Sequence, residues 1–313
     1  MVDKLIVATS PHLHKPESVS KIMWLVTLSL IPAGAAGVWI FGKDALQVIV
    51  LGVISALAAE ALLQLATKRK VTSFDGSAFL TGLLLAYNLP PQVPFWLPIA
   101  GSFFAIAIGK QIFGGLGQNI FNPALVGRVF LMASWPKYMT NFSAPIGYDA
   151  VTSATPLALA REGAAIGNLG YMELFLGNRG GCIGEVCIIA LLAGALFLLI
   201  KGYISWHVPF TYIFSVGLFT FIFGGNVYFS GDWIFHLLTG GLILGAFFMA
   251  TDYVTCPLTR KGQIIFGIGC GLLTAIIRIW GGYPEGVSYA ILMMNAATPI
   301  IDRYTKPRVY GKR

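Results

Sequence analysis

Residues 22–41 read IMWLVTLSLIPAGAAGVWIF, and residues 45–66 read ALQVIVLGVISALAAEALLQLA. Each run is almost entirely apolar, and each is as long as the roughly 20 residues with which an α-helix crosses about 30 Å of hydrocarbon. A basic cluster, Lys68-Arg69-Lys70, follows the second run and ends it. This stretch alone predicts a pair of membrane-spanning helices.

The rest of the chain has the same character. Of its 313 residues, 56% are hydrophobic and 11% are charged, less than half the roughly 25% that is usual in a soluble domain. This composition excludes a soluble enzyme, a disordered protein and a DNA-binding domain. The net charge of +8 is therefore attributed to basic residues that orient membrane segments, and nucleic acid is not an expected partner.

Apolar runs divide the chain into ten expected spans. They cover residues 22–41, 45–66, 77–89, 95–112, 120–135, 185–200, 207–223, 233–250, 264–280 and 287–301. Several of these runs are short or contain proline or glycine. The fold class that we predict is an all-α polytopic membrane protein with about ten transmembrane helices, some of them short or broken.

The two sets of five spans resemble each other. Residues 80–82 and 238–240 both read LTG, and QIFGG at 111–115 corresponds to RIWGG at 278–282. An odd number of spans per repeat inverts the second copy relative to the first, an architecture that tends to place a binding site near the midplane. The expected organisation is a five-span repeat in 1–135, an extracytoplasmic loop in 136–184 and a second five-span repeat in 185–313.

Basic residues predict the orientation of these spans. With the N-terminus inside, fifteen lysines and arginines lie in inner segments and four in outer segments. Because basic residues are retained on the cytoplasmic side, both termini are expected in the cytoplasm and the long loop outside. The expected location is a prokaryotic cytoplasmic (inner) membrane, crossed several times.

The long loop contains the sequence DAVTSATPL at residues 149–157. Small hydroxyl residues precede Pro156, and a proline biases the residue before it, Thr155, toward an extended backbone. Such a backbone can present the Thr155 hydroxyl to an incoming group. On composition alone, a solvated turn is the simpler interpretation.

These residues resemble the pattern Asp-x-x-(Ser/Thr)-Gly-Ala-Thr, at which a flavin transferase esterifies FMN phosphate onto the last threonine. Asp149, Thr152, Ala154 and Thr155 match the pattern, and Ser153 stands where it has glycine. Other separated segments agree in order: FDGS at 74–77, LTGLL at 80–84, FNPALVGR at 121–128 and ATDYVTCPLT at 250–259. Nearly the whole chain is similar to the D subunits of Rnf complexes and to their relatives, the B subunits of the Na⁺-translocating NADH:quinone reductase.

The resemblance implies an electron carrier rather than a self-sufficient enzyme. Thr155 would hold covalent FMN, with Asp149, Thr152, Ser153 and Ala154 around the attachment point, and a second flavin such as riboflavin is a further expected cofactor. In the assembled complex, electrons would pass between reduced ferredoxin and NAD⁺, coupled to Na⁺ or H⁺ transport. The implied partners are the other membrane and peripheral Rnf subunits, among them a second covalent-FMN subunit, and a flavin transferase for maturation.

Two alternatives stay open at this point. The quinone-reductase B subunit usually has a longer N-terminal extension, whereas the first span here begins near Ile22, which favours the Rnf subunit. A non-redox transporter is the other alternative, because inverted repeats with broken helices are also a transporter architecture.

A few ionisable and polar residues in or near the spans are candidates for a functional role. Asn122 and Arg128 are candidate flavin contacts, and Asp75, Asp252 and Glu60 are candidates for an ion pathway. Arg278 is expected near the outer end of its span, with its charge extended toward water. The four cysteines and four histidines have no metal-ligand spacing, so neither a metal site nor a catalytic residue is assigned.

Overall fold

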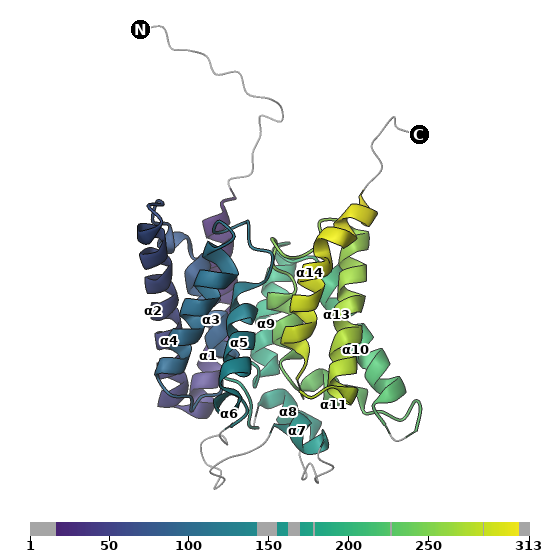
Figure 1. Ribbon diagram of the computed structural model, residues 1–313. Coiled ribbons are helices and arrows are strands. Elements are labelled where there is room, and N and C mark those ends of the chain that lie inside the picture. Colours follow the sequence, from purple (N-terminus) through teal and green to yellow (C-terminus); the bar gives the residue numbers. More distant parts are fainter. Residues whose placement is uncertain are drawn as a thin grey trace, which may run out of the picture.

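The computed structural model describes residues 17–142, 155–161 and 170–306, apart from Asn178, Asn226 and Pro284. The regular elements of these residues are helices, which stand side by side as a bundle (Figure 1). The longer ones are α1 (Val19–Phe41), α2 (Lys43–Ala66), α3 (Ser77–Tyr87), α4 (Trp96–Ile106), α5 (Pro123–Ser134), α9 (Ile188–Ile200), α10 (His207–Phe223), α13 (Arg260–Trp280) and α14 (Val287–Thr305). The short ones are η1 (Ser73–Asp75), η2 (Ala107–Gln111), α6 (Pro136–Met139), α7 (Pro156–Arg161), α8 (Tyr171–Leu176), α11 (Trp233–Leu238), α12 (Leu242–Leu244) and η3 (Gly245–Met249).

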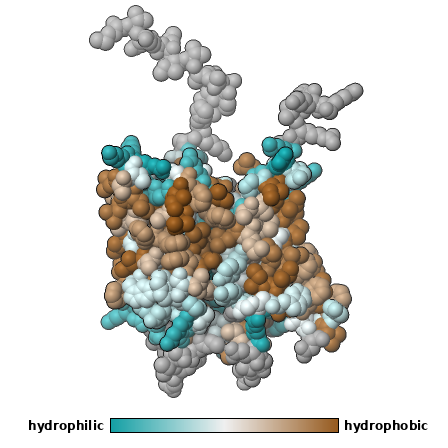
Figure 2. Space-filling view, in the orientation of Figure 1, coloured by the Kyte–Doolittle hydropathy of each residue, from teal (hydrophilic) through white to brown (hydrophobic). Residues whose placement is uncertain are grey.

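The bundle has the surface of a membrane protein. Helices α1, α2 and α13 are long and apolar enough to cross a membrane, and α3, α5, α9 and α10 are shorter apolar helices. On the face seen in Figure 2, hydrophobic residues cover the middle of the bundle and hydrophilic residues gather at both ends. The predicted all-helical membrane fold is confirmed at this level, and the ten-span count stays a prediction.

The eighth expected span, residues 233–250, is broken rather than continuous. Helix α11 ends at Leu238, Thr239 is extended, and Gly240 and Gly241 have φ angles of +71° and +64°. Glycine adopts this left-handed backbone without the steric cost that a Cβ would bring. The chain then resumes as α12 and the π-helical η3, so an uninterrupted span is the wrong description of this segment.

Helix α5 begins later than the apolar run that predicts it. The run starts at residue 120, but the helix starts at Pro123, after Asn122. The Asn122 side chain accepts a hydrogen bond from the Ala124 amide (3.1 Å), which satisfies an amide at the helix end. Proline fits the next position because it has no amide hydrogen to satisfy.

The helices pack in two groups, and the helix pairs in contact within the first group correspond in chain order to those within the second. In the first group α2 packs on α3 and α4, and α4 packs on α5; in the second, α10 packs on α11 and α13, and α13 packs on α14. Helix α1 packs beside the first group and α9 beside the second, and the two groups are joined by contacts of α1 with α9 and of α5 with α14. Backbones come close where Gly82 faces Gly52, since a Cβ on Gly82 would lie 2.6 Å from the Gly52 carbonyl oxygen, and closer still where Gly194 of α9 faces the Ser29 carbonyl oxygen of α1, at 2.1 Å.

The bundle has two distinct ends. Helix α1 begins and α14 ends at one end, which we call the termini side, while α6, α7 and α8 lie at the opposite end, the loop side (Figure 1). The arrangement agrees with an even number of crossings between the two ends of the described chain. That the termini side faces the cytoplasm stays a prediction from the basic residues.

Candidate functional site

Thr155 begins the short helix α7 on the loop side. Its Oγ1 accepts a hydrogen bond from the Ala158 amide (3.3 Å), and its carbonyl accepts one from the Leu159 amide (3.0 Å). These are the contacts of a threonine that caps a helix, with Pro156 in the favoured first position. The side chain is 5% exposed. The remaining predicted attachment residues, Asp149, Thr152, Ser153 and Ala154, lie outside the described residues.

Helix α7 packs against α8 and α11 through apolar contacts, and a hydrogen bond fixes α8. Leu157 is buried in a small cluster with Leu174 of α8 and Phe235 of α11. Helix α8 is fixed in turn, because the Tyr171 hydroxyl donates a hydrogen bond to a carboxylate oxygen of Asp232 (2.8 Å). This hydrogen bond raises the pKa of Tyr171. The segment after Thr155 is therefore held against α11.

A cavity of about 350 Å³ opens beside Thr155. We call it the loop-side pocket; it is lined by Arg128, Val129, Met132, Met139, Thr140, Phe142, Thr155, Ala158, Tyr283, Glu285, Gly286, Ser288 and Tyr289. These residues come from α5, α6, the start of α7 and the segment that leads into α14. The lining is mostly apolar and aromatic, with a few polar groups, as in pockets that bind small molecules.

Arg128 is the buried positive charge in the wall of this pocket. The guanidinium donates to Oδ1 of Asn88 and forms an ion pair with Glu285, and Cys182 Sγ lies 3.9 Å from Nη2. Since a buried charge is tolerated when it is paired and hydrogen-bonded, this arrangement keeps Arg128 ionised inside the bundle. The structure thus brings two predicted residues, Thr155 and Arg128, to one cavity.

Asn122 does not belong to that cavity. It lies nearer the termini side, where its Nδ2 donates to the Met249 carbonyl (3.2 Å) and its Oδ1 caps α5. Sequence reasoning missed Glu285, Tyr283 and Tyr289. The one available signal was positional, since Glu285 lies just before α14 as Asn122 lies just before α5.

A second buried arginine, Arg278, corrects another expectation. Its side chain is buried rather than extended to water, and its guanidinium donates to four backbone carbonyls. The acceptors are the carbonyl oxygens of His236 (2.5 Å), Thr239 (3.0 Å), Gly240 (3.2 Å) and Glu285 (3.1 Å). The break after α11 leaves the carbonyls of residues 236, 239 and 240 at a helix end, and Arg278 donates hydrogen bonds to them where water is scarce.

Three possible metal-ligand atoms also meet near Arg128. The donor atoms of Cys182, Glu185 and Glu285 lie within 4.8 Å of one another, and all three residues are buried. Glu285 is already paired with Arg128, and Glu185 accepts a hydrogen bond from the Cys182 amide (3.1 Å). The geometry therefore describes an ion-pair cluster that supports the pocket wall.

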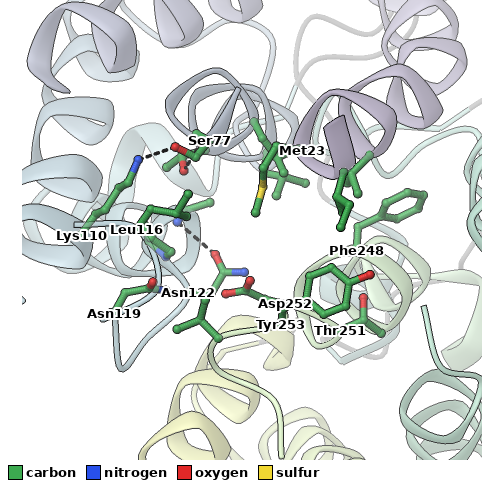
Figure 3. A pocket seen from close by; sticks show the side chains of 18 of the residues that line it. Met23, Ser77, Lys110, Leu116, Asn119, Asn122, Phe248, Thr251, Asp252 and Tyr253 are labelled. Atoms are coloured by element: carbon green, nitrogen blue, oxygen red, sulfur yellow. Dashed lines mark hydrogen bonds between the residues drawn. The ribbon is translucent and has the colours of Figure 1, made fainter. Parts of the chain in front are cut away.

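A smaller cavity of about 80 Å³ lies on the termini side, and Figure 3 shows its lining. This termini-side pocket is bordered by Met23, Ser77, Lys110, Leu116, Asn119, Asn122, Phe248, Thr251, Asp252 and Tyr253, among others. It lies between residues of the first helix group and the segment that contains η3. Polar side chains from both groups face it.

Of the three ion-pathway candidates, Asp252 lines this pocket, whereas Glu60 and Asp75 lie behind its lining and are bonded to the lining residues Lys110 and Ser77. Glu60 forms a buried ion pair with Lys110 (2.6 Å), and Lys110 Nζ also donates to Ser77 Oγ (2.6 Å). Ser77 donates in turn to Asp75, and Asp252 lines the same pocket. Sequence reasoning missed Lys110, although it is a charge inside the apolar run 95–112, and the π-helical turn η2 carries it.

A bundle of apolar helices with a buried arginine and a cavity beside a threonine of the loop side has the character of a membrane-embedded protein. The chain belongs to the NQR2, RnfD, RnfE family, whose model matches residues 6–311. It is 52% identical over 318 residues to the D subunit of the proton-translocating ferredoxin:NAD(+) oxidoreductase complex of Clostridium ljungdahlii, covering 98% of this chain and 96% of that protein.

Two further relatives carry related names. The D subunit of the Na(+)-translocating ferredoxin:NAD(+) oxidoreductase complex of Acetobacterium woodii is 50% identical over 309 residues, covering 98% of this chain and 95% of the relative. The D subunit of the ion-translocating oxidoreductase complex of Stutzerimonas stutzeri is 40% identical over 328 residues, covering 94% of this chain and 93% of the relative. The family predicted from separated motifs is confirmed.

Proposed function

We propose that this chain is the D-type membrane subunit of an ion-translocating ferredoxin:NAD⁺ oxidoreductase complex. Support comes from relatives of that name that align over nearly their whole length, together with the membrane-embedded helical fold. The chain would act with the other membrane and peripheral subunits of the complex, including a second covalent-FMN subunit. It would not turn over ferredoxin or NAD⁺ alone.

We propose that FMN is esterified to Thr155, and one observation carries this proposal: the threonine borders a cavity that suits a flavin ring. The cavity of about 350 Å³ falls within the roughly 300–1,000 Å³ of ordinary ligand pockets. Its apolar walls fit a planar heteroaromatic ring, and Arg128 fits the polar edge of such a ring or its phosphate. The residues present therefore fit the group.

The bound FMN would supply the capacity to accept and pass on electrons, and the protein would supply position and surroundings. Thr155 would fix the cofactor at the start of α7, which Leu157 and α8 hold against the bundle. Arg128 would place a positive charge in the pocket wall, where Asn88 and Glu285 orient its guanidinium. Met132 and Phe142 would help to keep water from the ring.

The finer architecture and maturation belong to the same proposal. The repeated contact pattern of the two helix groups supports two related five-span repeats, and the bias of basic residues supports a loop side outside and both termini in the cytoplasm of an inner-membrane protein. A flavin transferase acting outside would then reach the Thr155 loop. The hydroxyl must be accessible to that enzyme at some stage, although it is buried once α7 has docked.

The termini-side pocket is our proposed location for ion-linked chemistry. Asp252 supplies a carboxylate to its lining, and the lining residues Lys110 and Ser77 connect the Glu60 and Asp75 carboxylates behind it. The relatives are named for different ions, H⁺ and Na⁺, so the names do not choose between them. A second flavin such as riboflavin stays a prediction; a cavity of about 80 Å³ would have to widen to take its ring.

Mass spectrometry of the chain co-produced with its transferase tests the cofactor assignment. The wild-type chain should gain the mass of FMN less water, and the gain should map to the peptide that contains Thr155. Thr155→Val should abolish the gain and leave the protein in the membrane. Thr140→Val is the matched control, because Thr140 lines the same pocket but its hydroxyl is bonded to the Pro136 carbonyl (2.9 Å). An unmodified wild-type Thr155 peptide would contradict the proposal.

A further inference from the structure

Two tyrosines from the far end of the chain border the loop-side pocket. The rings of Tyr283 and Tyr289 are stacked, with centroids 5.1 Å apart and planes 26° apart. Both residues line the cavity that Thr155 borders, although more than a hundred residues separate them from it in the sequence. The pair lies just before and just inside the start of α14, where α14 packs against α5.

The two tyrosines are more exposed than Phe142, the other aromatic residue in the described lining. Phe142 is 7% exposed, and its surface is taken up by packing, whereas Tyr283 is 39% exposed and Tyr289 is half-buried. The remaining large lining residues, such as Met132, are flexible or aliphatic. The pair therefore supplies most of the aromatic surface that the described lining leaves free for a ligand.

The position of Tyr289 is fixed by its surroundings. It lies in the first turn of α14, after Gly286 with a φ angle of +67°, and its helical neighbours Ser288 and Ala290 are buried. Glu285, at the start of the same turn, is held by the ion pair with Arg128. Because both sides of this turn are anchored, the Tyr289 ring is presented from a rigid element.

We propose that Tyr289 stacks on the isoalloxazine ring of the flavin held at Thr155, with Tyr283 supporting Tyr289 as the second ring of the stack. This inference rests on the proposed function. Aromatic rings prefer offset-stacked contacts, which fix ring orientation as well as adding affinity. The ribityl chain of FMN is long enough to span a cavity of this size, so attachment at Thr155 and stacking at Tyr289 are compatible.

Tyr289 is thus a positioning residue that joins the two helix groups at the cofactor. Thr155 would fix the phosphate end from the loop, Arg128 would supply a charge from α5, and Tyr289 would fix the ring from α14. Displacement of α14 relative to α5 would then change the flavin environment without touching the ester.

Flavin fluorescence gives a test that does not depend on activity of the complex. An excited flavin is quenched by electron transfer from a tyrosine in contact with it, and phenylalanine does not quench because it is much harder to oxidise. Tyr289→Phe keeps the shape and the stacking but removes the donor. At equal FMN load, measured by mass, its fluorescence lifetime should rise several-fold over wild type, and Tyr283→Phe/Tyr289→Phe should show the longest lifetime.

The matched control is Tyr138→Phe. Tyr138 is 40% exposed, close to the exposure of Tyr283, and it packs on Trp96 outside the lining of the pocket. Its substitution should leave the lifetime unchanged. In addition, Tyr289→Leu should increase quenching by added iodide, because an uncovered ring becomes accessible to solvent.

The outcomes separate the two proposals. Equal lifetimes for wild type, Tyr289→Phe and the double variant, all carrying FMN on Thr155, would overturn the stacking and leave the covalent cofactor standing. A wild-type chain without FMN would instead overturn the proposed function, and this inference with it.

Discussion

The two pockets of the bundle treat buried charge in opposite ways. At the termini-side pocket, the Glu60–Lys110 pair is surrounded by further hydrogen-bonding side chains, and only about 80 Å³ is left open. At the loop-side pocket, Arg128 has partners on one side and a cavity of about 350 Å³ on the other. In the first arrangement the charges are enclosed by protein, whereas in the second the charge borders an open cavity.

Removing one partner of the termini-side pair should have the largest effect on stability. Lys110→Met leaves Glu60 as an unpaired buried carboxylate, which should cost roughly 3–5 kcal/mol of unfolding free energy. The double variant Glu60→Leu/Lys110→Met leaves no buried charge there and should be less destabilised than Lys110→Met alone. Equilibrium unfolding in mixed detergent measures both values.

Lys201→Met is the control, since Lys201 is exposed at the end of α9. This substitution should change the unfolding free energy very little. A double variant that is less stable than Lys110→Met would mean that the pair does not compensate buried charge, and the contrast between the pockets would fail.

A smaller effect is expected at Arg128. Arg128→Lys keeps the positive charge but loses the planar fork that reaches Asn88 and Glu285 together. Loss of one charge-assisted hydrogen bond should cost about 1.5–3 kcal/mol of unfolding free energy. The absorption spectrum of FMN bound at Thr155 should also shift, because a compact ammonium replaces the guanidinium in the pocket wall.

Differential scanning fluorimetry and the visible spectrum together check this result. Arg260→Lys, at the exposed start of α13, should change neither. A destabilised Arg128→Lys protein with an unaltered flavin spectrum would show that Arg128 supports the fold without contacting the cofactor.

The smallest effect on stability is expected at the hydrogen bond that fixes α8 to the loop side of the bundle. Tyr171→Phe removes the hydrogen bond to Asp232, and Tyr171 is exposed, so the fall in Tm should be slight. Because that bond raises the folded-state pKa of Tyr171 above its usual 10.0, its stabilisation is present below pH 10 and is lost as the pH rises through the higher folded pKa.

Wild type and Tyr171→Phe should therefore differ in Tm near neutral pH and converge in strong alkali. Tyr304→Phe, at an exposed tyrosine at the end of α14, should show no difference at any pH. A difference at Tyr171 that persists unchanged well above pH 10 would exclude the hydrogen bond as its source.

The sequence predicts some of these features and not others, for physical reasons. Residues 22–41 and 45–66 became α1 and α2 because uniform apolarity over a membrane thickness leaves a helix as the main option. The break after Leu238 was not predicted, since the same Leu-Thr-Gly lies within helix α3 at residues 80–82. The carbonyls exposed at the break are bonded by Arg278, which is distant in the sequence.

Some residues of the candidate site were likewise predicted from the sequence and others were not. Thr155 was found through a local motif, and Arg128 because a charge in a span needs an explanation. Glu285 and Tyr289 belong to no recognisable motif and do not stand out in the local sequence. Their importance depends on the packing of α14 against α5, which brings residues more than a hundred positions apart to one cavity.

The partners of the buried cations also set an order in biosynthesis. Glu60 and Ser77 leave the ribosome before Lys110, and three of the four carbonyls that accept from Arg278, those of residues 236, 239 and 240, precede it. Each of these cations therefore enters the bilayer with most of its acceptors already made. Arg128 is different, because Asn88 precedes it but Glu285 is synthesised more than a hundred residues later. The last of these ion pairs to close during synthesis is therefore the one beside Thr155.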